Sequence, residues 1–323
     1  MHKFWLRYLT AICLFLVCIS LILWLVYPLF DKTRRLSASP LPSFLTLTAN
    51  AQVTTLDIWL PIKNLFANNA SFADSLSAKS AVSYDLTSNQ TLFSKNANTR
   101  LPMASLTKIM TAIIALENRK NPDEYVVSSS DLVGEDSMGL TPGESLSLED
   151  LLYGLILHSG NDAAEVLADN YPAGRSAFID AMNAKAQALG LTNTHFTNPT
   201  GLEGDGKQYT TAYDLLVLTK YAIDNFPLFK QVVATFEYDI PSSDTHKEYY
   251  LENETNLLTS YPGVKGVKTG YTPEAGLCLV TYLEFGNQKI IGVVLGSGDR
   301  RDDMKDLLDY SLKKEGIKPP KHG

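Results

Sequence analysis

Residues 101–116 read Leu-Pro-Met-Ala-Ser-Leu-Thr-Lys-Ile-Met-Thr-Ala-Ile-Ile-Ala-Leu and place Ser105 three positions before Lys108. Apolar residues follow the lysine at helical spacing, so the run is predicted to form a helix that begins near the serine. Residues three apart share one face of a helix, a single turn from each other. In the first turn, unpaired backbone N–H groups favour negative charge that develops on a nearby oxygen. The pair is a candidate nucleophile and base, although this spacing is also common on ordinary exposed helices.

Two later motifs strengthen this interpretation. Residues 158–164 read His-Ser-Gly-Asn-Asp-Ala-Ala, and residues 267–272 read Val-Lys-Thr-Gly-Tyr-Thr. The order S-x-x-K, S-x-N and K-T-G is that of serine β-lactamases and penicillin-binding proteins. With residues 198–202, these motifs resemble the low-molecular-mass penicillin-binding proteins, the D-alanyl-D-alanine carboxypeptidase family. The resemblance extends over about residues 78–314.

The order of predicted elements gives an α/β (α+β) fold. Strand patterns open and close the body of the chain, and helical patterns lie between them. The strands are expected at 81–86, 91–93, 276–282 and 289–295, and the helices at 147–156, 178–189, 211–222 and 301–314. This order predicts one antiparallel sheet completed by both ends of the domain, flanked by helices, with a mainly helical second lobe. The resemblance implies the same β-lactamase/penicillin-binding-protein-like architecture, with the active site between the lobes, in a catalytic domain at 78–316 followed by a tail at 317–323.

Acyl transfer from a peptide requires a nucleophile, a base and an oxyanion hole. Ser105 is the predicted nucleophile. Lys108 can be its base only if burial or a nearby cation such as Lys268 lowers its pKa; otherwise it stays charged and only positions the serine. The Ser159 hydroxyl is expected to pass a proton to the leaving nitrogen. The Asn161 amide is expected to hold Lys108 and the substrate backbone.

The K-T-G motif is interpreted as the substrate-binding edge strand. Lys268 and the Thr269 hydroxyl would bind the terminal carboxylate, and Gly270 would let the substrate backbone approach closely as an added strand. The resemblance implies that the backbone N–H groups of Ser105 and Tyr271 form the oxyanion hole. Arg300 is either a second positive charge for the carboxylate or an exposed arginine of a turn.

The resemblance implies a serine-type carboxypeptidase. Such an enzyme attacks the D-Ala-D-Ala bond of peptidoglycan stem peptides, releases D-alanine and hydrolyses the acyl-enzyme on Ser105; β-lactam antibiotics mimic the dipeptide and acylate the same serine. No metal or organic cofactor is expected, since the five histidines lack ligand spacing. The net charge of −7 and the pI near 5.3 argue against nucleic-acid binding.

Alternatives stay open. A β-lactamase-like hydrolase would need a deacylating glutamate between the second and third motifs. Glu165 lies in a helical pattern and Glu203 in a glycine-rich loop, and neither has the surroundings of that residue. A non-catalytic, membrane-anchored peptidoglycan-binding protein is a further alternative. Endopeptidase or transpeptidase activity uses the same residues and is not separated by these motifs.

The N-terminus predicts a membrane anchor. From Leu9 to Phe30 the chain carries no charged side chain, a length that spans the hydrocarbon core as a helix. A cleavable signal peptide is the competing interpretation, but the apolar run is long and no typical cleavage site follows it. The prediction is an anchor at 1–35 and a spacer at 36–77. The resemblance places the catalytic domain on the outer face of the cell membrane, periplasmic or extracellular.

Overall fold

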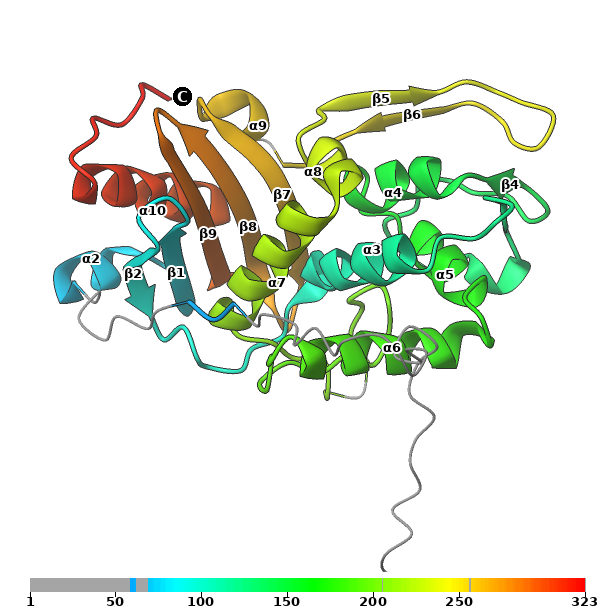
Figure 1. Ribbon diagram of the computed structural model, residues 1–323, viewed down its shortest axis with the longest axis horizontal. Coiled ribbons are helices and arrows are strands. Elements are labelled where there is room, and N and C mark those ends of the chain that lie inside the picture. The colour runs from blue at the N-terminus through cyan, green and yellow to red at the C-terminus, as the bar shows by residue number, and fades with distance from the viewer. Residues whose placement is uncertain (1–58, 62–68, 205, 256, 323) are drawn as a thin grey trace, which may run out of the picture. The chain divides into compact units, whose positions relative to one another are not determined.

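The computed structural model describes residues 59–61, 69–204, 206–255 and 257–322. Residues from Asp57 onward form one compact unit, built around a five-stranded sheet in the order β2-β1-β9-β8-β7 (Figure 1). Its strands are β1 (Ser80–Asp85), β2 (Gln90–Lys95), β7 (Val264–Thr272), β8 (Gly276–Phe285) and β9 (Gln288–Ser297). All neighbouring pairs are antiparallel, and β1 pairs with β9 from the other end of the chain. The predicted sheet, completed by both ends of the domain, is confirmed.

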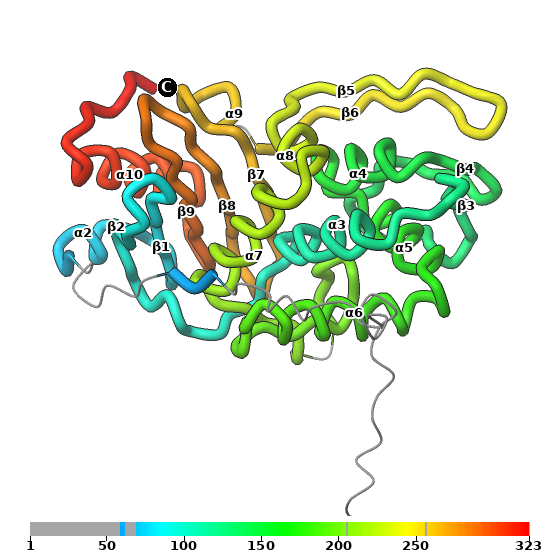
Figure 2. The backbone as a smooth tube through the Cα atoms, viewed as in Figure 1, coloured from blue at the N-terminus to red at the C-terminus, as the bar shows by residue number. Residues whose placement is uncertain are grey.

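Both faces of the sheet are covered, which explains why β9 is apolar along nearly its whole length. Alternate side chains point to opposite faces of a strand. Ile290 and Val294 pack with α10 (Arg300–Lys314), whereas Ile291 and Val293 pack into the cluster shared with the other helices. The predicted last helix is therefore confirmed as the cover of one face (Figure 2).

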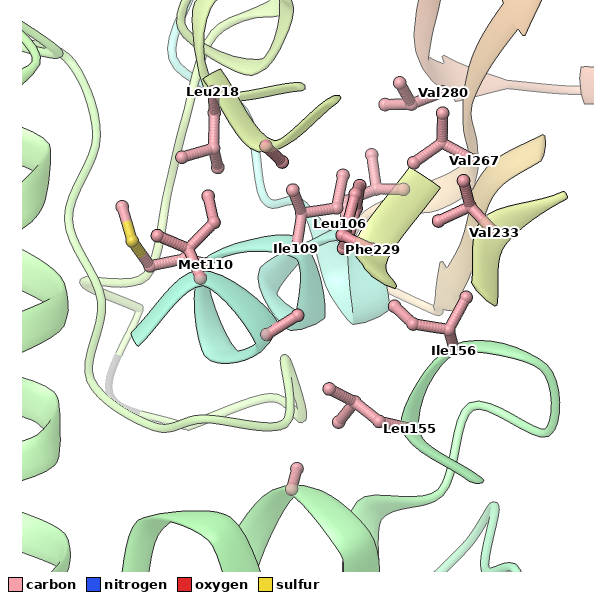
Figure 3. Packing of buried hydrophobic residues seen from close by; sticks show 14 of the residues in the cluster. Leu106, Ile109, Met110, Leu155, Ile156, Leu218, Phe229, Val233, Val267 and Val280 are labelled. Carbon is pink, nitrogen blue, oxygen red and sulfur yellow. The ribbon is translucent and has the colours of Figure 1, made fainter. Parts of the chain in front are cut away.

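The helices that lie between β2 and β7 in the sequence form most of the larger hydrophobic core. They are η2 (Ala104–Thr107, a 3₁₀ turn), α3 (Lys108–Glu117), α4 (Leu148–Ile156), α5 (Asn161–Asp169), α6 (Gly174–Ala188), α7 (Ala212–Asn225) and α8 (Pro227–Val233). Helix α3 lies at the centre, because its residues from Lys108 to Ala115 are all buried. Figure 3 shows Ile109 and Met110 packed among side chains of α4, α7 and the sheet. This central position holds the Ser105 turn against β7.

The predicted helix at 147–156 is confirmed as α4. The Ser147 hydroxyl accepts a hydrogen bond from the Asp150 backbone N–H at 3.1 Å and opens α4. Two short ribbons were not predicted, nor were η3 (Ser129–Asp131) and α9 (Leu257–Ser260). The ribbons pair β3 (Tyr125–Val126) with β4 (Ser145–Leu146), and β5 (Glu237–Ile240) with β6 (Tyr249–Glu252). Strands of two to four residues carry too few alternations to be recognised from sequence.

The segments outside the predicted catalytic domain are described only in part. The predicted anchor at 1–35 and most of the spacer at 36–77 lie outside the described residues. Within the spacer, Trp59 meets Tyr84 edge-on at 5.1 Å. Phe72 of α2 (Ala70–Ser75) stacks on Tyr310 at 4.3 Å between ring centroids. In the described part of the chain, no helix combines the length and apolar character needed to span a membrane.

Candidate active site

The Ser105 turn is held in a conformation that its sequence does not favour. Ala104 has a φ of 48°, in the left-handed region that non-glycine residues rarely adopt, and it is only 3% exposed. Two glycines allow the chain to close around this turn. A Cβ on Gly201, whose φ is 92°, would lie 2.0 Å from the Ala104 carbonyl oxygen, and one on Gly270 would lie 3.1 Å from the Ser105 nitrogen. Strand β7 and the loop at 198–202 therefore press directly on the serine from two sides.

Lys108 is fully buried and its amine has three partners. Its Nζ lies 2.9 Å from Ser105 Oγ, 2.7 Å from Asn161 Oδ1 and 2.7 Å from the Thr200 carbonyl oxygen. The side-chain amide of Asn161 is held in this orientation because its Nδ2 donates a hydrogen bond to the Glu135 carbonyl at 2.5 Å. A neutral amine has two N–H groups and one lone pair. The three contacts fit an ammonium that donates to all three oxygens, and they also fit a neutral Lys108 that donates to Asn161 and Thr200 and accepts the proton of Ser105.

The electrostatics of the site shift Lys108 toward its neutral form. Burial, and then the charge of Lys268, hold the pKa of Lys108 well below its usual range. Lys268 is 1% exposed, and burial lowers its pKa to about 8. The charge of Glu254 opposes that lowering, and the charge of Arg300 adds to it. The condition for Lys108 to act as a base, a lowered pKa, is therefore met, and burial and the charge of Lys268, which the sequence analysis named as alternatives, both contribute.

Ser159 lies in the link between α4 and α5. Its φ is 56°, again left-handed for a non-glycine residue, and its side chain is 2% exposed. Asn161 follows at the start of α5, and its backbone N–H donates to the Asp136 carbonyl at 2.7 Å. The buried carboxylate of Asp162 accepts the backbone N–H groups of 138–140, which fixes the loop beside Asn161. The structure thus brings Asn161 to Lys108 and holds Ser159 two residues away in the chain.

The K-T-G residues lie on β7, which is an edge strand of the sheet as predicted. Lys268 and Thr269 are buried, whereas Tyr271 is 60% exposed. Arg300 is half-buried, and its Nη1 donates to the Gly270 carbonyl at 2.9 Å. The interpretation of Arg300 as an exposed turn residue is therefore wrong, because its guanidinium binds the backbone of β7.

Three residues near the site were missed by the sequence analysis. Thr200 acts through its carbonyl, and a backbone atom leaves no signal in residue type; only the family-like stretch 198–202 could have indicated it. Glu254 is exposed and lies 3.4 Å from the Thr269 hydroxyl, where its charge opposes the lowering of the pKa of Lys268 and Arg300. The charge of Asp136 likewise opposes the lowering of the pKa of Lys108 and Lys268. The negative charges of Glu254 and Asp136 partly neutralise the positive charge of the site.

The glutamates considered for a β-lactamase-like reaction are engaged elsewhere. Arg175 binds Glu165 through two hydrogen bonds of 2.6 and 3.0 Å. Glu203 accepts the backbone N–H of Glu274 at 2.8 Å. Among the residues that the structure describes, no group of three or more His, Cys, Asp and Glu residues is arranged to hold a metal ion.

Comparison with known proteins identifies a matching family and a curated relative. A family model described as D-alanyl-D-alanine carboxypeptidase matches residues 67–299, a segment that includes all three motifs. D-alanyl-D-alanine carboxypeptidase DacF of Bacillus subtilis is 36% identical over 247 residues, covering 73% of this chain and 62% of DacF. The chain therefore spans less than two thirds of that relative's length.

Two solved structures have the same fold. The Streptomyces K15 DD-transpeptidase superposes with a TM-score of 0.70 at 34% identity, covering 74% of this chain and 98% of that chain. Penicillin-binding protein D2 from Listeria monocytogenes, in its cefotaxime-bound form, gives a TM-score of 0.64 at 31% identity, covering 73% and 98%. The antiparallel sheet with its flanking helices is thus a penicillin-binding-protein-like fold.

Proposed function

Since this chain belongs to the D-alanyl-D-alanine carboxypeptidase family of serine peptidases, we propose that it removes the terminal D-alanine from peptidoglycan stem peptides. The reaction passes through an acyl-enzyme on Ser105. One observation carries the proposal: the amine of Lys108 is buried, has a lowered pKa and lies 2.9 Å from Ser105 Oγ. That geometry meets the requirement for a serine nucleophile with its base.

Acylation begins as Ser105 Oγ attacks the carbonyl carbon of the D-Ala-D-Ala peptide bond and its proton moves to Lys108 Nζ. The backbone N–H groups of Ser105 and Tyr271 bind the developing oxyanion. Support comes from the close approach of β7 at Gly270 to the Ser105 nitrogen. The carbon–nitrogen bond then breaks, the nitrogen takes a proton through the Ser159 hydroxyl, and D-alanine leaves. Water attacks the ester in the second half and restores Ser105.

The C-terminal end of the substrate is recognised by positively charged and polar side chains. Lys268, the Thr269 hydroxyl and Arg300 bind the terminal carboxylate, and Asn161 binds the substrate backbone. β7 has a free edge along which the peptide adds as an antiparallel strand. A β-lactam carries a carboxylate and a reactive carbonyl in an arrangement like that of the D-Ala-D-Ala end of the substrate, so it acylates Ser105. This chain is inferred to be a penicillin-binding protein for that reason.

The direct test is release of D-alanine from a short peptide that ends in D-Ala-D-Ala, measured over a pH series. We expect turnover, with a KM that rises above about pH 8 because Lys268, whose pKa is about 8, then loses the charge that binds the carboxylate. A chromogenic cephalosporin provides the parallel assay. Rapid cephalosporin turnover without D-alanine release would establish a β-lactamase instead, and inertness toward both would leave a peptidoglycan-binding protein without catalysis.

The proposal includes a membrane anchor at residues 1–35 and a catalytic domain on the outer face of the cell membrane. Its support is the uncharged run from Leu9 to Phe30, together with a substrate that lies outside that membrane. The full chain is expected in the membrane fraction, released only by detergent, and accessible to protease added outside the membrane. A variant that lacks residues 1–35 should be soluble. Recovery of the full chain in the soluble fraction would contradict the anchor.

A further inference from the structure

A carboxylate from outside the three motifs reaches the place where the substrate carboxylate is expected to bind. Glu254 lies between β6 and α9, and the Thr269 hydroxyl donates to its Oε2 at 3.4 Å. Burial lowers the pKa of Lys268 and of Arg300, and for both groups the charge of Glu254 is the strongest influence in the opposite direction. Glu254 therefore acts on the same hydroxyl and the same two cations that the proposed reaction assigns to the terminal carboxylate of the substrate.

The backbone around Glu254 is fixed by hydrogen bonds to other parts of the fold. Its own N–H donates to the Leu157 carbonyl at 3.1 Å, at the end of α4. Asn253 is 3% exposed; its Nδ2 donates to the Thr235 carbonyl at 2.9 Å, and its Oδ1 accepts the Thr255 N–H at 2.9 Å. The fold thus sets the position of Glu254 beside β7, while its side chain stays exposed and has room to turn away.

Glu254 and a ligand carboxylate compete for Thr269. A threonine hydroxyl has one O–H group, so it donates either to Glu254 or to the ligand. A ligand oxygen about 2.8 Å from that hydroxyl would also lie no more than about 6 Å from Glu254 Oε2. Like charges at that separation repel each other, and salt screens them only in part because the Debye length is about 8 Å. Binding of a terminal carboxylate therefore requires Glu254 to turn away.

We propose that Glu254 is a specificity-determining residue whose carboxylate, in the free protein, takes the place of the substrate's terminal carboxylate at Thr269 and beside Lys268. The inference rests on the proposed function and adds how strongly that function depends on a free C-terminus. An internal carboxylate weakens the binding of ligands that end in a carboxylate and has much less effect on ligands that end in a neutral amide. Glu254 thereby narrows the preference for substrates with a free C-terminus over substrates whose C-terminus is blocked.

The test uses two peptides that differ only at the C-terminus: one ends in D-Ala-D-Ala with a free carboxylate, and the other ends in D-Ala-D-Ala amide. The assay is run below about pH 7, where Lys268, whose pKa is about 8, is charged. Glu254→Gln keeps the size of the side chain and removes its charge. We expect it to lower KM for the free acid by about two- to fivefold, the range of one partly exposed charge pair. The amide, measured as a competitor of the free acid, should bind equally well to both proteins.

The pH dependence gives a second readout that a purely structural role would not move. The charges that act on Lys268 are those of Glu254, Arg300 and Asp136, and its own charge acts on Lys108. Without Glu254, the stronger of the two opposing negative charges is lost, so the pKa of Lys268 falls further below its usual range. Lys268 then loses its charge at a lower pH. The KM of Glu254→Gln for the free acid should therefore begin to rise at a lower pH than that of the unchanged protein.

Glu252→Gln is the matched control, because it removes an exposed carboxylate two residues away on β6. It should behave as the unchanged protein in both assays. Thermal unfolding of Glu254→Gln should stay close to that of the unchanged protein, because the side chain is exposed and the backbone N–H keeps its partner.

An equal or higher KM of Glu254→Gln for the free acid, or an equal change for both peptides, would overturn the inference while leaving the carboxypeptidase intact. If no D-alanine is released by either protein, the proposed function fails. Calorimetric binding of the free acid to Ser105→Ala and to Ser105→Ala/Glu254→Gln then decides the inference independently. Tighter binding to the double variant supports it, and equal or weaker binding rejects it.

Discussion

Ser105→Ala is expected to abolish covalent labelling by penicillin and to lower D-alanine release by about 10⁴-fold or more, the scale of losing a serine nucleophile. The physical reason is that Oγ forms the acyl bond, and alanine offers no atom in its place. Intact-protein mass spectrometry after exposure to penicillin gives the most direct measurement. The unchanged protein should gain the mass of one penicillin molecule, and the variant should gain none.

The fold should survive this substitution. Only one of the three partners of Lys108 is lost, and the contacts of its Nζ with Asn161 and Thr200 remain. Thermal unfolding should therefore change by no more than a few degrees. Ser130→Ala, which changes an exposed serine of η3, provides a matched control that should label normally. A stable adduct on the Ser105→Ala protein would place the nucleophile elsewhere and reject the mechanism.

Lys108→Met is expected to slow acylation by about 10²- to 10⁴-fold, the usual contribution of a general base. Methionine fits the buried space of the lysine stem but has no amine to take the proton of Ser105. The measurement is the rate of acylation by a fluorescent penicillin as a function of pH. In the unchanged protein the rate should rise as the pH passes upward through the lowered pKa of Lys108, because only the neutral amine accepts a proton. In the variant that rise should disappear.

The pH profile also separates the two interpretations of Lys108. If the lysine stayed charged and only positioned Ser105, acylation would not increase with the deprotonation of Lys108. The variant Lys120→Met serves as the control, since Lys120 belongs to a partly exposed contact with Asn170. Circular dichroism must show that Lys108→Met is folded, because the Thr200 carbonyl and the Asn161 amide lose a donor. Each buried acceptor left without a partner costs about 1–3 kcal/mol.

Much of the architecture could be predicted because periodicity and burial are linked. Helix α4 has its apolar side chains on one face and a serine at its start, and both features are local. The apolar run at 289–295 indicated a strand, which the structure confirms as β9. The ribbon of β5 and β6 could not be predicted in the same way. Its position depends on a contact between Ser145 and Thr245, which lie 100 residues apart in the chain.

The sequence by itself determined which chemistry is available: a serine and a lysine one turn apart, an asparagine, and a K-T-G segment on a strand. The sequence also placed Gly201 and Gly270 in stretches that resemble family motifs, but it did not show why glycine is needed at these two positions. Only the tertiary structure showed that a Cβ at either glycine would press on the Ser105 turn. Only the tertiary structure, likewise, showed that Ala104 adopts a left-handed conformation.

The lowered pKa of Lys108 is the property that only the tertiary structure decided. Its pKa depends on complete burial and on charges carried by Lys268, Asp136 and Glu254, which are distant from it in the sequence. Desolvation and Coulomb energies depend on distance and on the surrounding dielectric, and residue order does not contain either quantity. Residue types and spacing therefore identified the pair, and the fold lowered the pKa of its lysine.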